Sequence, residues 1–450
     1  MQILTHSPKI QLYNNLGTTI KYELSPIYNA NYPSGQNLLS YSFQKSINNF
    51  SSQWSIAIKE ALQGEQRIFD QFEIFDVIKI YEDGTSLSYI GVLINISYTA
   101  SARGNQKVVN ISGYGIEYLF QYLTMSLDAT AMSYLGSFAE TNSDGIMLKD
   151  TLNHQGVTIK EAINEIYKSF TGTAEKKVPL LTNTTIIKMI NKWYGDDKFD
   201  AGNIKFQYPI ASNLYQNTTV NLISYLRNLL PQNIYEIYST IKNNKPIIKI
   251  RELPFDLDNN GWKGLKCSPI KSDVLTDYTM TKSGSEVFTV FYSYVEGSIL
   301  DHDRYVKINS NQDGFDTAAK NENKLALYGY KPLCLNFIGF NCGEADNSET
   351  NKSLKENFKK LNNRVKTWYE NLDEMYTATI SVINNGQNVA SIGERISFLN
   401  GEFYVTGEDH QWNYGGSNKL IYHCERGGVY STNTFQPLKN ITKAFAEIEV

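Results

Sequence analysis

Residues 394–413 read ERISFLNGEFYVTGEDHQWN, and this stretch predicts a pair of antiparallel strands. Apolar and polar side chains alternate along both runs, which is typical of strands with one buried face. Asn400-Gly401 lies between the runs and predicts a tight hairpin turn. The turn Tyr414-Gly415-Gly416 leads into a third strand at Leu420–Cys424. We therefore expect Thr377–Gly427 to form an antiparallel meander that curls into a small barrel.

A similar pattern occurs earlier in the chain, at Asp76–Gly115. There DVIKIYEDG, LSYIGVLINISYTA and KVVNISGYG stand in the order of GERISFLNG, EFYVTGEDHQWNY and KLIYHCERG. Each copy has a strand that ends in a glycine turn, a strand with an internal glycine (Gly91 or Gly407) and a last strand that ends near a glycine. Few residues are identical, so two unrelated meanders are the alternative interpretation. The pattern predicts a duplicated unit.

Composition narrows the class of protein. The chain has 450 residues, enough for several domains, and 41% of them are hydrophobic. Its net charge of −4 argues against a nucleic-acid binder that depends on a basic surface. The N-terminal sequence has no signal-peptide pattern, and no run approaches the ~18 apolar residues of a membrane span. The four cysteines are scattered, as expected of buried thiols in a reducing cytoplasm.

Helical patterns interrupt the strand patterns after the first meander. Leu39–Phe50 and Gln53–Lys59 are expected to pair as further strands of the first barrel. Thr158 with Glu161 is a capping box, and it starts an apolar repeat of helical period. Two more helices are expected in the same insert, at Thr184–Tyr194 and Thr218–Leu230. The next segment predicts a hairpin built from Ile234–Ser239 and Pro246–Arg251.

The rest of the chain completes the predicted domain order. Strands at Leu275–Thr281 and Phe288–Val295 are expected to start the second barrel. The helix Asn351–Leu372 carries an apolar stripe that favours packing on a neighbouring element over a coiled coil. The predicted fold class is α+β, mainly β: two similar antiparallel barrel domains with a helical insert and a hairpin-containing middle region. The expected domains are 1–124 (first barrel), 125–232 (mostly helical insert), 233–270 (hairpin-containing middle region), 271–297 with 373–430 (second barrel), 298–372 (polar excursion and long helix) and 431–450 (polar tail).

The most enzyme-like cluster is Glu408-Asp409-His410 with His423-Cys424 on the facing strand. Alternation places Glu408 and His410 on one face of the strand and Asp409 on the other. His410 and His423 could face each other, but a metal site needs more ligands that converge on one point. No third ligand is evident, so the alternative is a hydrogen-bonded histidine near a barrel rim.

Other acidic segments give weaker signals. Asp256, Asp258 and Asn260 match the front half of a calcium loop, but Cys267 stands where the loop needs a bidentate glutamate. An Asp/Asn turn is the alternative there. Asp301-His302-Asp303 is expected to be solvated surface. The chain has no P-loop, dinucleotide fingerprint or Gly-x-Ser-x-Gly elbow, so we predict no catalytic, cofactor-binding or metal site.

The order of these segments resembles the baseplate and tail hub proteins of bacteriophages and related contractile injection systems. The resemblance begins with the first meander and continues through PIIKIRELPFD (residues 246–256) and LYGYKPL (residues 327–333). Its most specific part is the closing pattern FYVTGEDHQWNYGGSNKLIYHCERG, residues 403–427.

The resemblance implies a virion structural protein of the tail baseplate, assembled in the bacterial host cytoplasm. It implies a homotrimer that binds the tail tube protein, the central spike protein and other baseplate proteins, around a lumen through which DNA passes without sequence-specific binding. No lysozyme-like or peptidase domain is appended, so no enzyme activity is implied. The alternatives are a tail-associated cell-wall hydrolase and a carbohydrate-binding receptor protein at the tail tip.

The duplication also predicts the symmetry. Three subunits with two equivalent barrels give six positions, which would match a sixfold tube to a threefold spike. The units Asp76–Gly115 and Thr377–Gly427 should then superimpose, related by a rotation of about 60° around the trimer axis. Trp412 is expected to anchor the second barrel by capping its open end.

Overall fold

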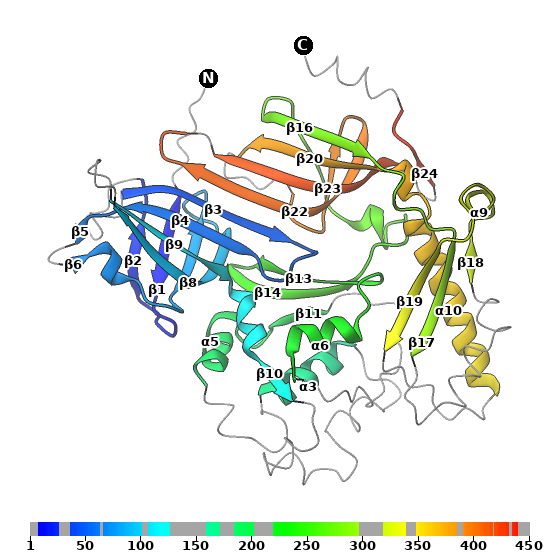
Figure 1. The fold of residues 1–450 in the computed structure, drawn as a ribbon, viewed down its shortest axis with the longest axis horizontal. Helices are drawn as coiled ribbons and strands as arrows, with labels where there is room; N and C mark the ends of the chain where they lie inside the picture. Colours follow the sequence, from blue (N-terminus) through cyan, green and yellow to red (C-terminus); the bar gives the residue numbers. More distant parts are fainter. Residues whose placement is uncertain are drawn as a thin grey trace, which may run out of the picture.

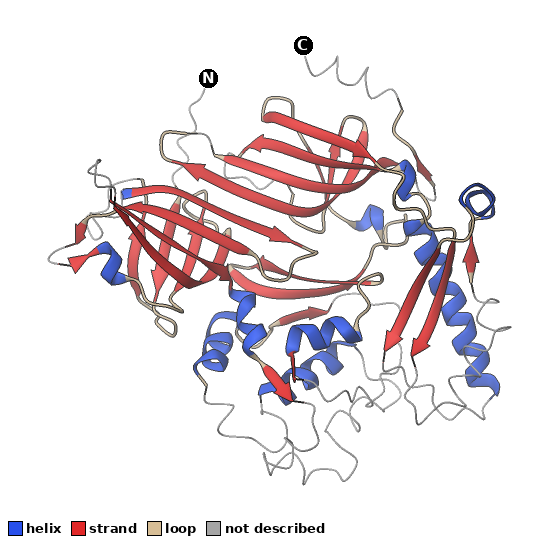
Figure 2. Cartoon of the chain, viewed as in Figure 1, coloured by secondary structure: helices blue, strands red, loops and turns tan. Residues whose placement is uncertain are grey.

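The fold is α+β and mainly β, as the sequence predicts (Figures 1 and 2). Among the residues that the structure describes, no helix is long and apolar enough to cross a membrane. The computed structural model describes residues 8–26, 37–63, 66–100, 107–126, 159–171, 184–201, 219–296, 318–338, 348–384, 390–416, 418–431 and 434–439.

A single sheet of 14 strands contains both predicted meanders. Its main path is β16 (Leu275–Lys282), β20 (Tyr376–Ile383), β23 (Lys419–Tyr430), β22 (Gly401–Asn413), β3 (Leu38–Ser46), β4 (Gln53–Lys59), β9 (Lys107–Gly115), β8 (Tyr89–Ala100), β7 (Val77–Tyr81), β1 (Lys9–Tyr13) and β2 (Ile20–Leu24). The branches are β15 (Cys267–Pro269), β21 (Arg395–Phe398) and β24 (Phe435–Gln436). The two meanders are thus joined edge to edge, and their closure into two separate barrels stays a prediction.

The strand order confirms that one unit occurs twice. The first repeat, defined as β3, β4, β7, β8, β9 and β1, has the order β3-β4-β9-β8-β7-β1 across the sheet. The second repeat, defined as β16, β20, β21, β22, β23 and β15, has the order β16-β20-β23-β22-β21-β15. When the first repeat without β1 and the second repeat without β15 are each numbered 1 to 5 along the chain, both have the order 1-2-5-4-3 across the sheet. One difference is that β15 lies parallel to β21, whereas β1 is antiparallel to β7.

The two repeats agree in strand register as well as in strand order. The β8–β9 ladder shifts between Leu93 and Asn95, and the β22–β23 ladder shifts at the equivalent place, between Val405 and Gly407. The ladder between the first two strands of each repeat has a matching shift, between Leu38 and Ser40 in β3 and between Leu275 and Asp277 in β16. Bulges bend a strand at a fixed position, so their coincidence is a specific sign of duplicated geometry.

The hairpin turn before β22 lies one residue earlier than the sequence indicates. Phe398 is opposite Gly401, so the two turn residues are Leu399 and Asn400. Both have positive φ values, 50° and 61°, as the two-residue hairpin turn requires. The prediction placed Asn400-Gly401 in the turn because glycine tolerates such angles best. Gly401 instead begins β22, where Leu438 packs against it too closely for a side chain.

The helical insert packs on the meanders through a shared core. Its helices are α3 (Ile159–Thr171), α5 (Thr185–Tyr194) and α6 (Leu222–Leu229), and the side chain of Thr184 caps α5 by accepting from the amide of Ile187. Helix α6 begins after the predicted Thr218, because Thr219–Asn221 pairs as a strand. Phe120 contacts the rings of Tyr194 and Phe199, which joins the insert to the end of the first repeat. Capping residue Thr158 lies outside the described residues.

Further elements are a central hairpin, several short strands and four 3-10 helices among the described residues. The hairpin of β13 (Tyr235–Lys242) and β14 (Lys245–Glu252) turns at Asn243-Asn244, as expected. The others are β5 (Leu62–Gln63), β6 (Gln66–Arg67), β10 (Thr124–Ser126), β11 (Phe199–Ala201), β12 (Thr219–Asn221), η2 (Ile68–Gln71), η3 (Ile116–Tyr122), η4 (Trp262–Gly264) and η6 (Leu372–Glu374).

A third unit stands beside the second repeat. It contains α9 (Glu322–Tyr328), α10 (Ser348–Tyr369) and a sheet of β17 (Val290–Glu296), β18 (Ala319–Lys320) and β19 (Pro332–Ile338). The prediction that β17 starts the second barrel is therefore wrong, although β16 does belong to that repeat. Helix α10 lies against β17 in Figure 1, with its predicted stripe buried at Phe358, Leu361, Val365 and Trp368.

Candidate functional site

The junction between the two repeats is the strongest candidate site, because it is where the duplicated unit meets its own copy. Strand β22 divides its pairing there: Gly401–Tyr404 pairs with β21, and Gly407–Asn413 pairs with β3 of the first repeat. The bulge at Thr406 separates the two halves. Figure 1 shows β22 and β3 side by side where the two parts of the sheet meet.

Four charged side chains meet inside this junction, and Lys45 alone among them keeps some exposure, 14% of its side chain. His410 Nδ1 lies 2.9 Å from a carboxylate oxygen of Glu82, and Lys45 Nζ lies 2.9 Å from Glu408 Oε1. The exposed fractions of His410, Glu82 and Glu408 are 0%, 1% and 1%. Asn384 donates a hydrogen bond of 3.0 Å to Glu82. Buried charges are stable only when they are paired, so each repeat depends on the other for its partners.

The pairing shifts the pKa values of the buried groups in opposite directions. Burial alone would lower the pKa of His410, but the carboxylates of Glu82 and Glu408 raise it to about 9. Burial alone would raise the pKa of Glu408, but Lys45 and His410 lower it to about 2. The pKa of Glu82 is also lowered, against the effect of burial, by His410 and Asn384. His410 is thus a cation between two carboxylates at neutral pH.

Aromatic rings complete the buried face of the junction. The imidazole of His410 stacks on Phe43 with ring centroids 4.2 Å apart, and Trp412 stacks on Tyr41 at 5.8 Å. Trp412 is 6% exposed and packs in the core cluster of the first repeat. The prediction that Trp412 anchors the second barrel is therefore wrong, because β22 carries it across the junction.

The other face of β22 holds a separate and exposed pair. Asp409 lies 2.9 Å from Nε2 of His423, a contact that raises the pKa of His423. The alternation predicted for Glu408, Asp409 and His410 is confirmed. The expectation that His410 could face His423 is wrong, since β22 places the two imidazoles on opposite faces of the sheet. Cys424 is buried, which raises the pKa of its thiol.

A lane of small polar side chains runs along this open face and crosses the junction. Cross-strand pairing keeps the lane on one face: Ser55 lies opposite both Ser42 and Ser112, and Gln44 opposite both Gln53 and Asp409. Its hydroxyl and amide members are Ser42, Gln44, Gln53, Ser55, Asn95, Ser97, Thr99, Asn110, Ser112, Thr279, Thr281, Thr377, Thr379 and Gln411. The central part is hollowed into a concavity of about 430 Å³.

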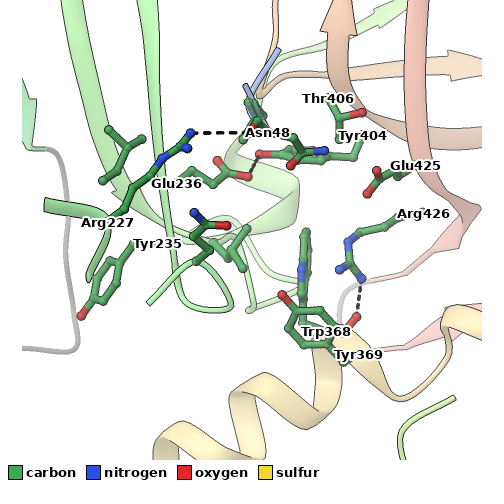
Figure 3. A pocket seen from close by; sticks show the side chains of 14 residues that line it. Asn48, Arg227, Tyr235, Glu236, Trp368, Tyr369, Tyr404, Thr406, Glu425 and Arg426 are labelled. Carbon is green, nitrogen blue, oxygen red and sulfur yellow. Dashed lines mark hydrogen bonds between the residues drawn. The ribbon is translucent and has the colours of Figure 1, made fainter. Parts of the chain in front are cut away.

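A second cavity, of about 120 Å³, lies where β13, α10, β22 and β23 meet (Figure 3). Two lining residues accept hydrogen bonds from Arg251: the carboxylate of Glu236 at 2.9 Å and the hydroxyl of Tyr404 at 2.6 Å. The guanidinium of Arg426 lies 3.9 Å from the ring centre of Trp368 and donates to that residue's carbonyl. These contacts fasten the hairpin and α10 to the second repeat.

The proposed calcium-loop residues form a turn. Asp258 accepts from the amide of Asn260 at 2.8 Å, and the Asp256 carboxylate faces the guanidinium of Arg364 at 3.2 and 3.3 Å. Within the described ranges, no group of three or more His, Cys, Asp or Glu residues is placed to hold a metal ion. Asp301-His302-Asp303 lies outside the described residues.

Sequence reasoning missed Lys45 and Glu82, the partners that the first repeat supplies. A signal was present in both strands. Lys45 follows Tyr41 and Phe43 on the apolar face of β3, and Glu82 follows Ile78 and Ile80 on that of β7. A charged residue in an apolar register predicts a buried partner, but the pattern does not identify it.

Comparison with known proteins gives similarities among solved structures only. No model of a known protein family matches the chain, and no curated protein matches it. Among solved structures, the 43 kDa tail protein of prophage MuSo2 from Shewanella oneidensis is 11% identical, with a TM-score of 0.47 and coverage of 93% of this chain and 98% of that one. The structure is similar to those of tail proteins.

Two further solved structures belong to the same class. The tail protein from Neisseria meningitidis MC58 is 8% identical, with a TM-score of 0.47 and coverage of 94% of this chain and 98% of that one. The prophage tail protein gp18 from Listeria monocytogenes EGD-e is 10% identical, with a TM-score of 0.42 and coverage of 98% and 99%. The likeness of this chain to all three tail proteins is one of fold.

Proposed function

We propose that this chain is a structural hub of a phage or phage-like injection particle. Three copies would form an adaptor between the sixfold tail tube and the threefold central spike, around a lumen that conducts DNA. The tail tube protein, the spike protein and other baseplate proteins would be its neighbours in the virion. The observation that supports this proposal best is the duplicated unit with matching order, register and bulges.

The duplication supports a ring by simple geometry. Each chain already contains one side-by-side junction of two equivalent repeats, β22 against β3. Repeating an equivalent junction between chains generates a closed ring when the rotation fits, and closure prevents open-ended growth. Three chains then give six equivalent positions toward the tube. The insert and the α10 unit are unlike each other, so they would leave threefold symmetry on the spike side.

The polar lane suits the wall of a DNA channel. DNA-binding surfaces hold phosphates with lysine and arginine, and the affinity grows with the number of such contacts. The lane offers mainly hydroxyl and amide groups, with Lys59 and Lys419 as cations on the same face, and its central acid, Asp409, is paired with His423. A wall of this kind would let DNA slide without holding it. We therefore assign the open face of the sheet to the lumen.

The two residues that best supported the enzyme alternative, Glu408 and His410, are not accessible in this geometry. Glu408 and His410 are sealed by packing and paired with Lys45 and Glu82, so a substrate has no route to them. We therefore propose a non-enzymatic role. A zymogram on purified peptidoglycan tests it: a clear zone that disappears on Glu408→Gln substitution would establish the hydrolase instead.

Mass measurement in solution tests the hub itself. We expect the full-length chain of 51.1 kDa to form a trimer, alone or after addition of its tube or spike partner. Light scattering coupled to size exclusion would report the mass, and electron microscopy of the trimer would show a ring with six similar repeats. A stable dimer with a twofold interface would contradict the proposal.

A further inference from the structure

Two strand edges remain without a strand partner among the described residues, and they are equivalent to the two edges that form the junction. Past Leu93, β8 pairs with β9 on one side only, so the outer edge of Asn95–Ala100 is open. Strand β16 ends the main sheet path and pairs with β20 on one side only. In Figure 1, β16 forms the upper border of the sheet.

The equivalence follows from the register of the repeats. β8 corresponds to β22. Val92 pairs with the first residue of β7, and Tyr404 pairs with the first residue of β21. In both strands the bulge begins one residue later. β16 corresponds to β3. Each is the first strand of its repeat and pairs with the second strand, β20 or β4, and in both the ladder shifts directly after the first pair, at Leu275 or Leu38. The open half of β8 therefore matches the half of β22 that pairs with β3.

We propose that Asn95–Ala100 of β8 pairs antiparallel with β16 of a second copy of this chain, in the register of the internal junction. This inference deepens the proposed ring by naming the contact between its subunits. The internal pairs Glu408–Lys45, Asp409–Gln44, His410–Phe43, Gln411–Ser42 and Trp412–Tyr41 define the register. The corresponding pairs between copies are Ile96–Lys282, Ser97–Thr281, Tyr98–Met280, Thr99–Thr279 and Ala100–Tyr278.

The side chains on these edges suit such a contact. Tyr98 is 37% exposed and stands where His410 stacks on Phe43, so it would lie on Met280 of the second copy. Ile96 and Met280 are half-buried on the same face and would lose their remaining exposure. On the lane face, Thr99 would lie opposite Thr279 and Ser97 opposite Thr281, pairs that favour cross-strand contact. The polar lane would then continue from one copy to the next.

The contact between copies would differ from the internal junction in its charges. Ile96 stands where Glu408 is, and Tyr98 stands where His410 is, so the buried ion pairs are absent from the equivalent positions. The one charged side chain in the proposed register is Lys282, which would stand opposite Ile96; it is exposed at the end of β16, so its ammonium group can stay in water while its aliphatic part packs. This composition suits an interface that forms between separately folded chains, whereas the internal junction forms within one folding chain.

Paired cysteines test the register. Directly opposite residues in antiparallel strands have Cα atoms about 4.5–5.5 Å apart, within the reach of a disulfide, whereas diagonal pairs are about 7–8 Å apart. We would combine Ser97→Cys with Thr281→Cys in the full-length chain, in a background with Cys267→Ser and Cys342→Ser. The shifted control combines Ser97→Cys with Thr279→Cys. The internal control combines Gln44→Cys with Asp409→Cys, the corresponding pair within one chain.

We expect oxidation of the matched pair to give covalent species of two and three chains on a non-reducing gel, at least tenfold more than the shifted pair gives. The internal control should lose two thiols without forming covalent oligomers. A trimer by mass in which the matched pair does not link, or links no better than the shifted pair, would overturn this interface and leave the hub proposal standing. A chain that stays monomeric with its partners and does not link would contradict both.

Discussion

At the residue scale, the junction depends on His410, a cation between two buried carboxylates. Removing one member of such a group leaves a buried charge without a partner, which is more costly than removing the whole group. His410 also has two roles that a lysine would not combine, because its ring stacks on Phe43 while its nitrogens face Glu82 and Glu408. The network therefore fixes both the charge and the shape of the junction.

The pKa of His410 gives the stability a defined pH dependence. Its folded-state pKa of about 9 lies above the usual 6.5, so its contribution is fully present below pH 6.5 and is lost as the pH rises through 9. The folded-state pKa of Glu408, about 2, lies below the usual 4.5, so its contribution is present above pH 4.5 and is lost as the pH falls toward 2. Both contributions are complete between pH 4.5 and 6.5.

We expect the free energy of unfolding to fall by an amount on the order of 3 kcal/mol between pH 6 and 9.5, since one pKa unit corresponds to about 1.4 kcal/mol. Urea titrations at a series of pH values measure it. His410→Gln should be less stable at pH 6 and nearly flat across that range, whereas His423→Gln should keep most of the decline. A His410→Gln profile parallel to that of the unsubstituted chain would show that another group is responsible.

Trp412 provides a second test at this scale. Trp412→Ala should lower the free energy of unfolding by about 3–5 kcal/mol, because a large buried side chain leaves a cavity. The indole is packed on Tyr41 of the first repeat, so both repeats should lose stability together. Tyr414→Ala is the matched control, since Tyr414 is 66% exposed nearby. Equal melting temperatures of the two variants would contradict the packing of Trp412.

At the scale of elements, strand β22 decides how the repeats are joined. Its first half completes its own repeat and its second half extends the other, and the bulge at Thr406 sits between them. A bulge bends the strand and increases its twist, which directs the second half toward β3. The insert is held to the end of the first repeat by packing at Phe120, which contacts α5 and β11, and by a backbone hydrogen bond from Leu222 to Leu123.

Phe120 therefore tests whether the insert unfolds separately. Phe120 is completely buried, so Phe120→Ala should lower the free energy of unfolding by about 3–5 kcal/mol. Because one core cluster includes the insert and the second repeat, we expect a single calorimetric transition at a lower temperature. Tyr122→Ala, at a 44% exposed position on the same helix η3, is the control. An early separate transition in the Phe120 variant would show that the insert is an independent domain.

At the scale of the whole molecule, the polar lane is the surface that would face DNA in the proposed hub. Its position on one continuous face follows from the pairing of strands from both repeats. Gln44 and Gln53 lie in the central concavity and bond to each other at 3.2 Å. Positive charge introduced there would face any DNA in the lumen.

We expect Gln44→Lys combined with Gln53→Lys to make the assembled ring bind DNA at low salt, with an affinity that falls steeply as salt is added. Fluorescence anisotropy with a labelled duplex measures this, and particles that carry the variant should release DNA more slowly. Asn363→Lys with Thr367→Lys adds the same charge on the exposed side of α10 and serves as the control. If the control binds DNA as strongly as the lane variant, the lane does not line the channel.

Local patterns were enough to predict most strands and helices. The meanders, the β13–β14 hairpin and the stripe of α10 all follow from periodicity and turn residues, which depend on nearby positions. The sequence predictions were wrong where the structure depends on which distant strand a segment pairs with. Thr219–Asn221 pairs with β10 although it continues a helical pattern, and Phe288–Val295 has a strand pattern that does not specify which sheet it joins.

The sequence by itself predicted that one unit occurs twice, because alternation and glycine turns recur in each copy, and the strand order then confirmed it. The sequence also determined that Glu408 and His410 share a face, since that follows from the two-residue period of a strand. Only the tertiary structure decided that β22 would leave its own repeat and pair with β3, which carried Trp412 into the other core and brought Lys45 and Glu82 to Glu408 and His410. The reason is physical: pairing between distant strands depends on which edges are open and how bulges bend them, and local periodicity carries no information about either.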